Sequence, residues 1–125
     1  MPFVDARDIA AVSIKAFSEP GHDGKAYVLT GPEALSHGEV AGILAKATGK
    51  RFVYEDIPPE TCRRQLIGEG ASEYYADLIL NLFARTRRLG TAKIHDDIRK
   101  VLGRSAIAFR EFARDFTGEL AKQVA

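Results

Sequence analysis

The chain has 125 residues, of which 46% are hydrophobic and 28% are charged, a composition that is typical of a folded domain and excludes a disordered tail. The 18 basic and 17 acidic residues leave a formal charge of +1, which excludes a strongly basic surface for nucleic acid. With one cysteine, Cys62, and no long apolar run, we expect a cytoplasmic protein that has no internal disulfide and does not enter a membrane.

The chain opens with an expected strand tail at residues 2–5 that runs directly into a helix. Asp5 has the side chain of an N-cap, and Asp8 falls in the first turn, where the helix dipole favours a carboxylate. Residues 25–30 and 51–57 are short and contain aromatic and β-branched side chains. They predict two short strands.

Local signals mark the start and end of two helices in the middle of the chain. Ser36 is followed three residues later by Glu39, the pattern of a capping box, and Gly49 supplies the left-handed stop. Pro59 suits a first helical position, so a short helix is expected from there to Gly68.

Three further helices are expected after residue 70. Ser72 opens the longest of them, which carries a wide apolar stripe. A brief helix follows at residues 96–102, and a final one carries a row of apolar side chains over 109–120. Because Ala108 cannot cap that last helix, Ser105 is its expected N-cap. Together the elements predict an α+β fold, a mainly helical single domain with two or three short strands.

Several segments occur in one order that resembles the second half of NmrA-like proteins, which are atypical short-chain dehydrogenases. These are FVDARDIA at 3–10, GKAYVLTGPEALS at 24–36, EVA at 39–41, TGK at 48–50 and the stretch 103–115. The resemblance covers nearly the whole chain. It implies that residues 1–125 form the C-terminal, substrate-side domain of such a protein, and that the Rossmann domain, which binds NAD(P) in full-length members, is absent.

The cofactor signals of these enzymes are not found in this sequence. The nearest glycine pair, Gly21 and Gly24, precedes an expected strand and indicates a turn rather than a phosphate-binding loop. No tyrosine is followed four residues later by lysine, the pair that activates the tyrosine in classical short-chain dehydrogenases. We therefore expect no catalytic and no cofactor-binding residue in this chain.

Two functions follow, and the sequence leaves both open. The resemblance implies a substrate-side fragment of an NAD(P)-dependent oxidoreductase or redox sensor that is not catalytically competent alone. Its partner would be a separate Rossmann-domain chain or a second copy in a homodimer, since the strand at 25–30 and the stripe after Ser72 would otherwise expose apolar surface. The alternative is a stand-alone module that binds a small ligand or a protein without chemistry. A remnant without function is a third possibility.

Five residues form the expected substrate-binding set: Phe3, Tyr54, Tyr74, Tyr75 and Leu78. An apolar surface that ends in phenolic hydroxyls suits a small aromatic or quinone-like ligand. The alternative is that the tyrosine rings fill the core.

Other reactive residue types have simpler interpretations. Cys62 has the spacing of a core-facing residue, and Ser36 precedes His37 without the turn of a hydrolase nucleophile. His, Asp and Asp at 95–97 are consecutive, so they cannot converge on one ion and more simply cap a helix. The arginines within 85–88 complement a helix dipole. We predict no metal site and no nucleic-acid partner.

Overall fold

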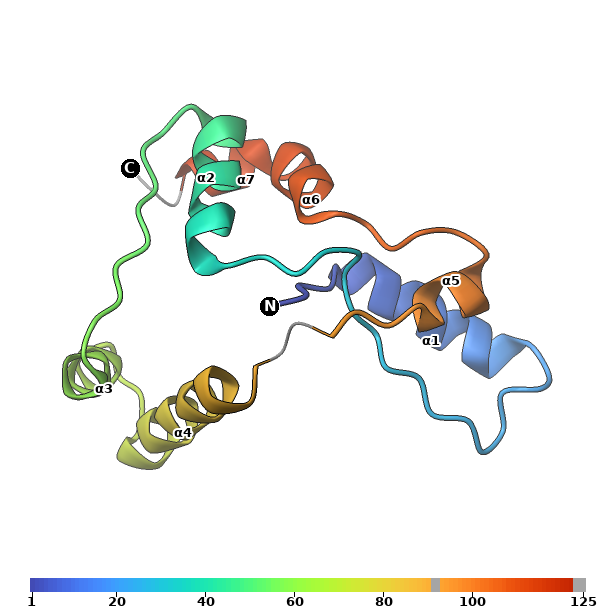
Figure 1. Ribbon diagram of the computed structural model, residues 1–125, viewed down its shortest axis with the longest axis horizontal. Coiled ribbons are helices and arrows are strands. Elements are labelled where there is room, and N and C mark those ends of the chain that lie inside the picture. Colours follow the sequence, from blue (N-terminus) through green and yellow to red (C-terminus); the bar gives the residue numbers. More distant parts are fainter. Residues whose placement is uncertain (91–92, 123–125) are drawn as a thin grey trace. The chain divides into compact units, whose positions relative to one another are not determined.

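The computed structural model describes residues 1–90 and 93–122. The chain divides into two compact units: unit 1 comprises Met1–Tyr54 and Ala92–Ala125, and unit 2 comprises Glu55–Thr91. The described residues contain the helices α1 (Ala6–Ser18), α2 (His37–Thr48), α3 (Pro59–Gly68), α4 (Glu73–Leu89), α5 (Asp97–Leu102), α6 (Phe109–Asp115) and α7 (Thr117–Lys122) (Figure 1). None of these helices is long and apolar enough to span a bilayer.

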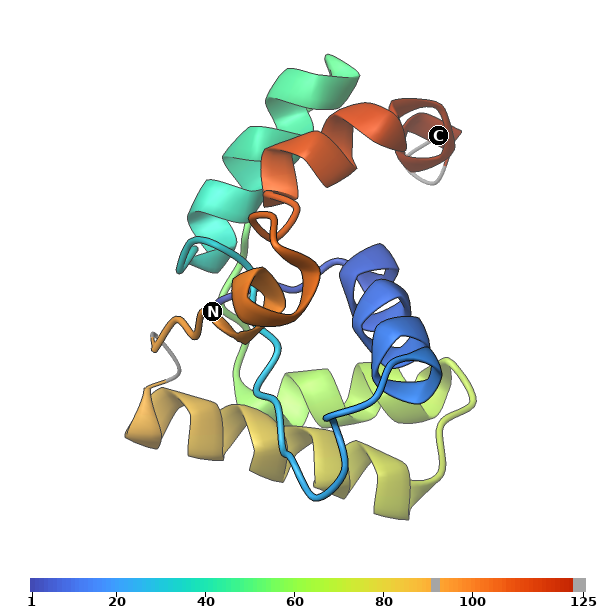
Figure 2. The ribbon, with the colours of Figure 1, turned by 90° about the vertical axis from the view of Figure 1, so that its right-hand side faces the viewer.

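The apolar core of unit 1 lies where α1 packs on α5. Val12, Ile98 and Val101 are buried there, and Tyr27 and Leu29 pack against them from the extended segment between α1 and α2. Elsewhere in the same unit α2 packs against α6 and α7. Figure 2 shows the teal α2 beside the orange-red α6. Unit 1 is therefore assembled from pairs of helices that are far apart in the sequence.

The predicted helix starts at Asp5, Ser36 and Ser72 are confirmed by their capping hydrogen bonds. The Asp5 carboxylate accepts a bond from the backbone N–H of Arg7. Ser36 and Glu39 form the complete capping box at α2, and the Ser72 hydroxyl caps α4. These bonds satisfy N–H groups that the first turn of a helix leaves without partners.

The prediction of an α+β fold with two or three short strands is wrong. The described residues contain no strand, and the segments 2–5, 25–30 and 51–57 run as irregular chain. In the second of these, the Val28 N–H donates to the Asp97 carboxylate, and the Thr30 hydroxyl exchanges hydrogen bonds with the backbone of His95. A strand needs a neighbouring strand for its backbone groups, and here isolated side-chain partners take that place.

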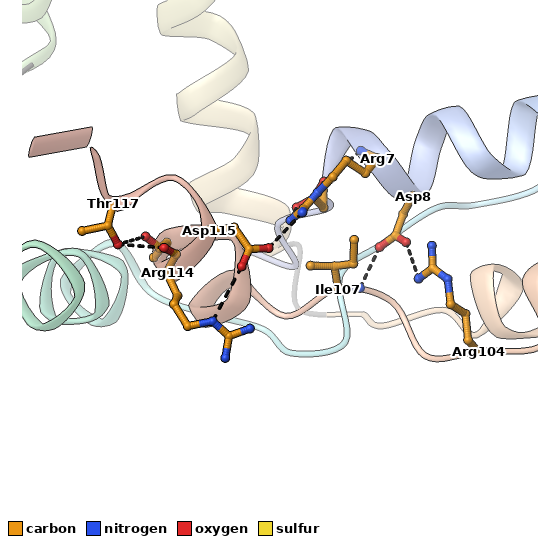
Figure 3. A network of polar contacts seen from close by, with 9 residues as sticks. Arg7, Asp8, Arg104, Ile107, Arg114, Asp115 and Thr117 are labelled. Carbon is orange, nitrogen blue, oxygen red and sulfur yellow. Dashed lines mark hydrogen bonds and ion pairs between the residues drawn. The ribbon is translucent and has the colours of Figure 1, made fainter. Parts of the chain in front are cut away.

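The C-terminal helix is also not the continuous element that the sequence predicts. It is divided into α6 and α7 at Phe116. The Thr117 hydroxyl donates to the carbonyl oxygens of Ala113 and Arg114, as drawn in Figure 3. Such side-chain bonds to carbonyls of the preceding turn bend helices. The expected cap at Ser105 is wrong as well, because its hydroxyl accepts a bond from Arg99 instead and α6 begins only after Ala108.

Residues 95–97 do not cap α5 in the expected way. Asp96 stands at the N-cap position but makes no capping hydrogen bond, and its carboxylate pairs with Lys100 one turn further along. The pairing holds the pKa of Asp96 below its ordinary value. Its neighbour Asp97 accepts the Val28 bond, so this helix start serves to hold the extended segment between α1 and α2.

Unit 2 is built around the packing of α3 on α4. Ala76 of α4 is completely buried, and its small side chain permits close contact between helices. Arg63 of α3 pairs with Glu73 and Asp77 of α4 at 3.1 and 2.7 Å. These bonds join neighbouring helices along the chain, in contrast to the long-range contacts of unit 1.

Candidate functional site

Phe3 is placed by close contact between the first residues of the chain and the segment that leads to α2. The Gly31 N–H donates to the Pro2 carbonyl, and the Leu35 N–H donates to that of Met1. A Cβ atom at position 31 would lie 1.8 Å from the carbonyl oxygen of Phe3, so only glycine permits this approach. The aromatic ring of Phe3 is thereby fixed beside α2 and α6.

Asp5 and Arg7 form the polar side of the site. The Asp5 carboxylate is 4% exposed and accepts hydrogen bonds from Nε and Nη2 of Arg7 at 3.0 and 2.8 Å. These side-chain bonds are the main reason that the pKa of Asp5 lies below its ordinary value. Arg7 also pairs with Asp115 at 2.9 Å and lies over the ring of Phe116 at 5.4 Å. Its charge is therefore compensated by carboxylates from both sides.

A buried carboxylate fixes the chain that leads into α6. Asp8 is completely buried, pairs with Nη1 of Arg104 at 2.7 Å and accepts the backbone N–H of Ile107 at 2.7 Å (Figure 3). A buried charge is tolerated when it is paired and hydrogen-bonded in this way. The contact holds residues 104–107 against α1 and so positions α6 beside the start of α1.

An aromatic pocket of about 290 Å³ lies between these elements. Its lining consists of Phe3, Val4, Asp5, Ala6, Arg7, Ile107, Phe109, Phe112 and Phe116. Successive ring centroids from Phe109 to Phe112 to Phe116 are 5.6 and 5.0 Å apart, and Phe3 lies 5.5 Å from Phe109. The volume is at the lower end of the range for small-ligand sites and suits a single aromatic ring system.

The side chains of this lining are suited to binding an aromatic molecule. Its two ionisable side chains, Asp5 and Arg7, are paired with each other. The apolar rings can contact the faces and edges of a conjugated ligand, and the Asp5–Arg7 pair gives the pocket one polar edge. The pocket can thus hold and orient an aromatic molecule.

The structure brings two of the five expected substrate-binding residues near each other. Phe3 lies edge-on to the ring of His37 at 6.2 Å, and Tyr54 stacks on the same histidine at 5.0 Å with an interplanar angle of 18°. His37 thus contacts both expected residues. Of the five expected residues, Phe3 is the one that lines the pocket. In the sequence, His37 was considered only as a candidate hydrolase residue beside Ser36.

The remaining three expected residues belong to unit 2. Tyr74, Tyr75 and Leu78 lie on α4 and are 79%, 50% and 51% exposed, so these tyrosine rings do not fill a core. Ala76 between them is the residue that α4 buries.

The phenylalanines of α6 were missed as site residues. Phe109 and Phe112 lie in α6 and Phe116 directly follows it, and their spacing predicts only a row of apolar side chains on one helix face. A repeat of three aromatic residues rather than aliphatic ones was the available signal, because aromatic side chains are frequent in ligand pockets.

Comparison with known proteins identifies relatives over most of the chain. The NmrA-like family matches residues 1–112. An NAD(P)H azoreductase of Xenophilus azovorans is 42% identical over 112 residues, which is 90% of this chain and 39% of that protein. A reductase of Streptomyces griseus, the (4-alkanoyl-5-oxo-2,5-dihydrofuran-3-yl)methyl phosphate reductase, is 28% identical over 96% of this chain and 42% of its own length. The chain thus spans about two-fifths of these relatives.

Two solved structures share the fold. The triphenylmethane reductase of Citrobacter sp. superposes with a TM-score of 0.76 at 23% identity, over 92% of this chain and 40% of its own. The NADPH-dependent quinone oxidoreductase QOR2 of Escherichia coli gives a TM-score of 0.80 at 23% identity, over 93% of this chain and 42% of its own. The resemblance seen in the sequence is therefore confirmed, and this chain belongs to the NmrA-like family.

Proposed function

We propose that this chain is the substrate-side part of an NAD(P)-dependent reductase and that it does not carry out reduction alone. One observation carries the proposal. The chain is 42% identical to an NAD(P)H azoreductase over 90% of its own length, but it covers only 39% of that enzyme. A shared segment of this extent indicates a shared role. Chemistry that uses the nicotinamide cofactor then depends on the other part of the protein.

We infer that the described residues do not hold the cofactor's pyrophosphate. Pyrophosphate binds where a helix N-terminus presents free N–H groups and a positive dipole end. All seven described helices instead have a carboxylate in the first turn, which repels an anion there: Asp8, Glu39, Glu60, Glu73, Asp97, Glu111 and Glu119. This charge pattern supports a division of labour in which the present chain contacts the substrate.

The proposed substrate is an aromatic or quinone-like molecule that enters the aromatic pocket. Four phenylalanine rings line the pocket, and Phe3, one of the expected residues, is among them. Three of the named relatives are an azoreductase, a triphenylmethane reductase and a quinone oxidoreductase, and the compounds in these names contain conjugated rings or double bonds. Tyr54 is proposed to extend the contact surface through its stack on His37. Contacts from Tyr74, Tyr75 and Leu78 stay a prediction.

A binding experiment tests the substrate part of the proposal. Titration of the chain with a small quinone, followed by isothermal calorimetry, should give saturable binding that Phe112→Ala weakens by about tenfold, because one wall of the pocket is lost. Phe17→Ala is the matched control, since Phe17 is 92% exposed and outside the pocket. Equal effects of the two substitutions would rule out the pocket, and thermal melts check that both variants are folded.

An activity experiment tests the division of labour. The chain alone should not oxidise NADPH in the presence of a quinone or an azo dye. A titration that gave a dissociation constant below about 10 μM for NADPH would contradict the proposal, because that affinity corresponds to roughly −7 kcal/mol and requires an organised site.

A stand-alone binding module is the second candidate function. It is favoured by one observation: every residue that lines the pocket belongs to unit 1. The two candidates differ when the dinucleotide-binding portion of the Xenophilus azovorans azoreductase is added as a separate chain. Dye reduction that requires both chains supports the reductase, whereas unchanged ligand binding without reduction supports the module.

A further inference from the structure

The exposed side of α4 carries four residues at the spacing of a helix-pairing seam. Tyr75, Leu78, Leu82 and Arg85 follow one another at intervals of three, four and three residues. This is the repeat by which one helix presents a continuous stripe to another. The first three are 50%, 51% and 54% exposed, and Arg85 is exposed as well. We call these four residues the α4 seam.

The α4 seam lies on the side opposite to the contact with α3. At 100° per residue, Leu78 and Leu82 project on average about 140° away from Ala76, which is buried. Glu73 and Asp77, which pair with Arg63 of α3, also lie away from the seam. The helix thus has two apolar sides, of which α3 covers one.

The seam is complementary to itself when one copy is reversed. Its residues are arranged symmetrically about position 80, so an antiparallel copy places Leu78 opposite Leu82 and Tyr75 opposite Arg85. The inner layers would be leucine against leucine. In the outer layers, the arginine would lie on the tyrosine ring, a favourable cation–π contact. A parallel copy would instead place Arg85 against Arg85, which is repulsive.

We propose that a second copy of this chain packs antiparallel along the α4 seam and forms a two-fold symmetric dimer. The dipoles of the two helices also favour the antiparallel arrangement. A symmetric dimer uses the same patch on both copies, which agrees with the self-complementary order of the seam. This inference goes beyond the proposed function, because it concerns a partner and not the substrate.

A small ligand is a less suitable occupant of the seam. The four residues lie along one side of a single helix, which is a convex surface, whereas ligand sites are concave. Tyr75 and Leu78 are nevertheless among the expected substrate contacts, so the experiment must separate the two uses.

The first test measures self-association of the 125-residue chain by sedimentation from about 1 to 500 μM. The wild type should form a dimer. Leu78→Glu and Leu82→Lys should each weaken it by at least about tenfold, because each places two charges in the leucine layers. Both leucines are about half exposed, so circular dichroism should show unchanged helix content. Ile14→Glu on α1 is the control: Ile14 is 67% exposed and its substitution should leave the dimer intact.

The second test mixes the two weakened variants. In the antiparallel dimer, a Leu78→Glu chain and a Leu82→Lys chain form one glutamate–lysine layer and retain one leucine–leucine layer. Mixing them should therefore restore association to within about threefold of the wild type. A parallel dimer would contain neither layer and would show no such recovery.

Several results would overturn the inference. These are a wild type that stays monomeric at the highest concentration, a dimer that resists both leucine substitutions, a dimer that Ile14→Glu dissolves, and a mixture that does not recover. Loss of quinone binding in Leu78→Glu without a change in association would assign the face to a ligand instead. Failure of the proposed function would be observed in a different experiment. It would appear as quinone binding that Phe112→Ala leaves unchanged, and it would not alter the dimer.

Discussion

The two units differ in how far apart in the sequence their stabilising contacts reach. In unit 1, the Asp8 carboxylate accepts the backbone N–H of Ile107, 99 residues away, and Thr30 bonds to His95 over 65 residues. In unit 2, Arg63 bonds to Glu73 and Asp77, which are only 10 and 14 residues away. Unit 1 is thus held by contacts between distant segments, and unit 2 by contacts between successive helices.

Unit 1 also buries more side chains than unit 2. Unit 1 contains a cluster of buried Val12, Ile98 and Val101, together with the buried carboxylate of Asp8. Among the described side chains of unit 2, Ala76 alone is buried. Regions with few buried apolar contacts open at low free energy. Unit 2 therefore has the weaker core of the two units.

The largest expected effect comes from removing the buried carboxylate of unit 1. Asp8→Ala leaves the Ile107 N–H without its acceptor and Arg104 without its partner, and should lower the free energy of unfolding by about 3 kcal/mol. Hydrogen exchange followed by mass spectrometry should show the loss of protection in unit 1. Asp8→Asn retains an acceptor oxygen and should cost less. An equal loss of protection in both units would mean that they unfold together.

A smaller effect is expected from overpacking the α3–α4 contact. Ala76→Leu adds three carbon atoms where the side chain is completely buried, and should destabilise unit 2 by about 2 kcal/mol. Amide hydrogen exchange should accelerate in α3 and α4 more than in α1. Ala84→Leu is a matched control, because Ala84 lies on the same helix and is exposed. Similar stability of the two variants would contradict the assigned packing of α4.

A serine cap occurs in both units, and its removal should cost less stability than the two substitutions above. Ser36 and Ser72 each accept a backbone N–H at 3.2 Å, at the starts of α2 and α4. Alanine at either position should cost about 1 kcal/mol. In unit 2 the loss should appear as fraying of the first turn of α4, since few other contacts hold it. Denaturant melts measure the loss of stability, and residue-level hydrogen exchange measures the fraying of α4. An unchanged melt for Ser36→Ala would refute the capping box.

Local signals explain how much of the fold could be predicted from the sequence. The starts of α1, α2 and α4 were found because Asp5, Ser36 and Ser72 act within three residues of their own position. Gly49 at the end of α2 has the expected left-handed conformation, with φ of 70°. Such features depend on neighbouring residues and need no knowledge of tertiary contacts.

The wrong predictions concern features that distant segments decide. Residues 25–30 have the composition of a strand, but the described residues offer no strand beside them, and their partners are Asp97 and His95. Asp8 was predicted to interact with the helix dipole alone, and its pairing with Arg104 became visible only in the folded chain. A composition pattern reports a preference, and the available partner determines the outcome.

The candidate site was predictable in part for the same reason. Phe3 belongs to the expected substrate-binding set and lines the pocket. The phenylalanines at 109, 112 and 116 line it as well, and the ring of His37 contacts that of Phe3, because the fold brings α2, α6 and the first residues together. No spacing along the sequence places these elements together. The row at 109, 112 and 116 was visible, and its role depended on whether another element covered it.

The smallest expected effects concern acid and salt, and they separate the two units by exposure. Hydrogen bonds from Arg7 hold the pKa of Asp5 below its ordinary 3.8, and those from Arg63 do the same for Asp77. A carboxyl whose pKa is lower in the folded state stabilises folding above pH 3.8, and this contribution is lost as the pH falls through the folded pKa. Because the Asp5 side chain is 4% exposed and that of Asp77 is 52% exposed, salt should screen the second pair more strongly. Carboxyl-carbon NMR titrations at low and high salt should therefore show the pKa of Asp77 returning toward its ordinary value while that of Asp5 stays low. Arg7→Met should raise the pKa of Asp5 at either salt concentration, and an equal salt response at both positions would remove the distinction between a buried and an exposed ion pair.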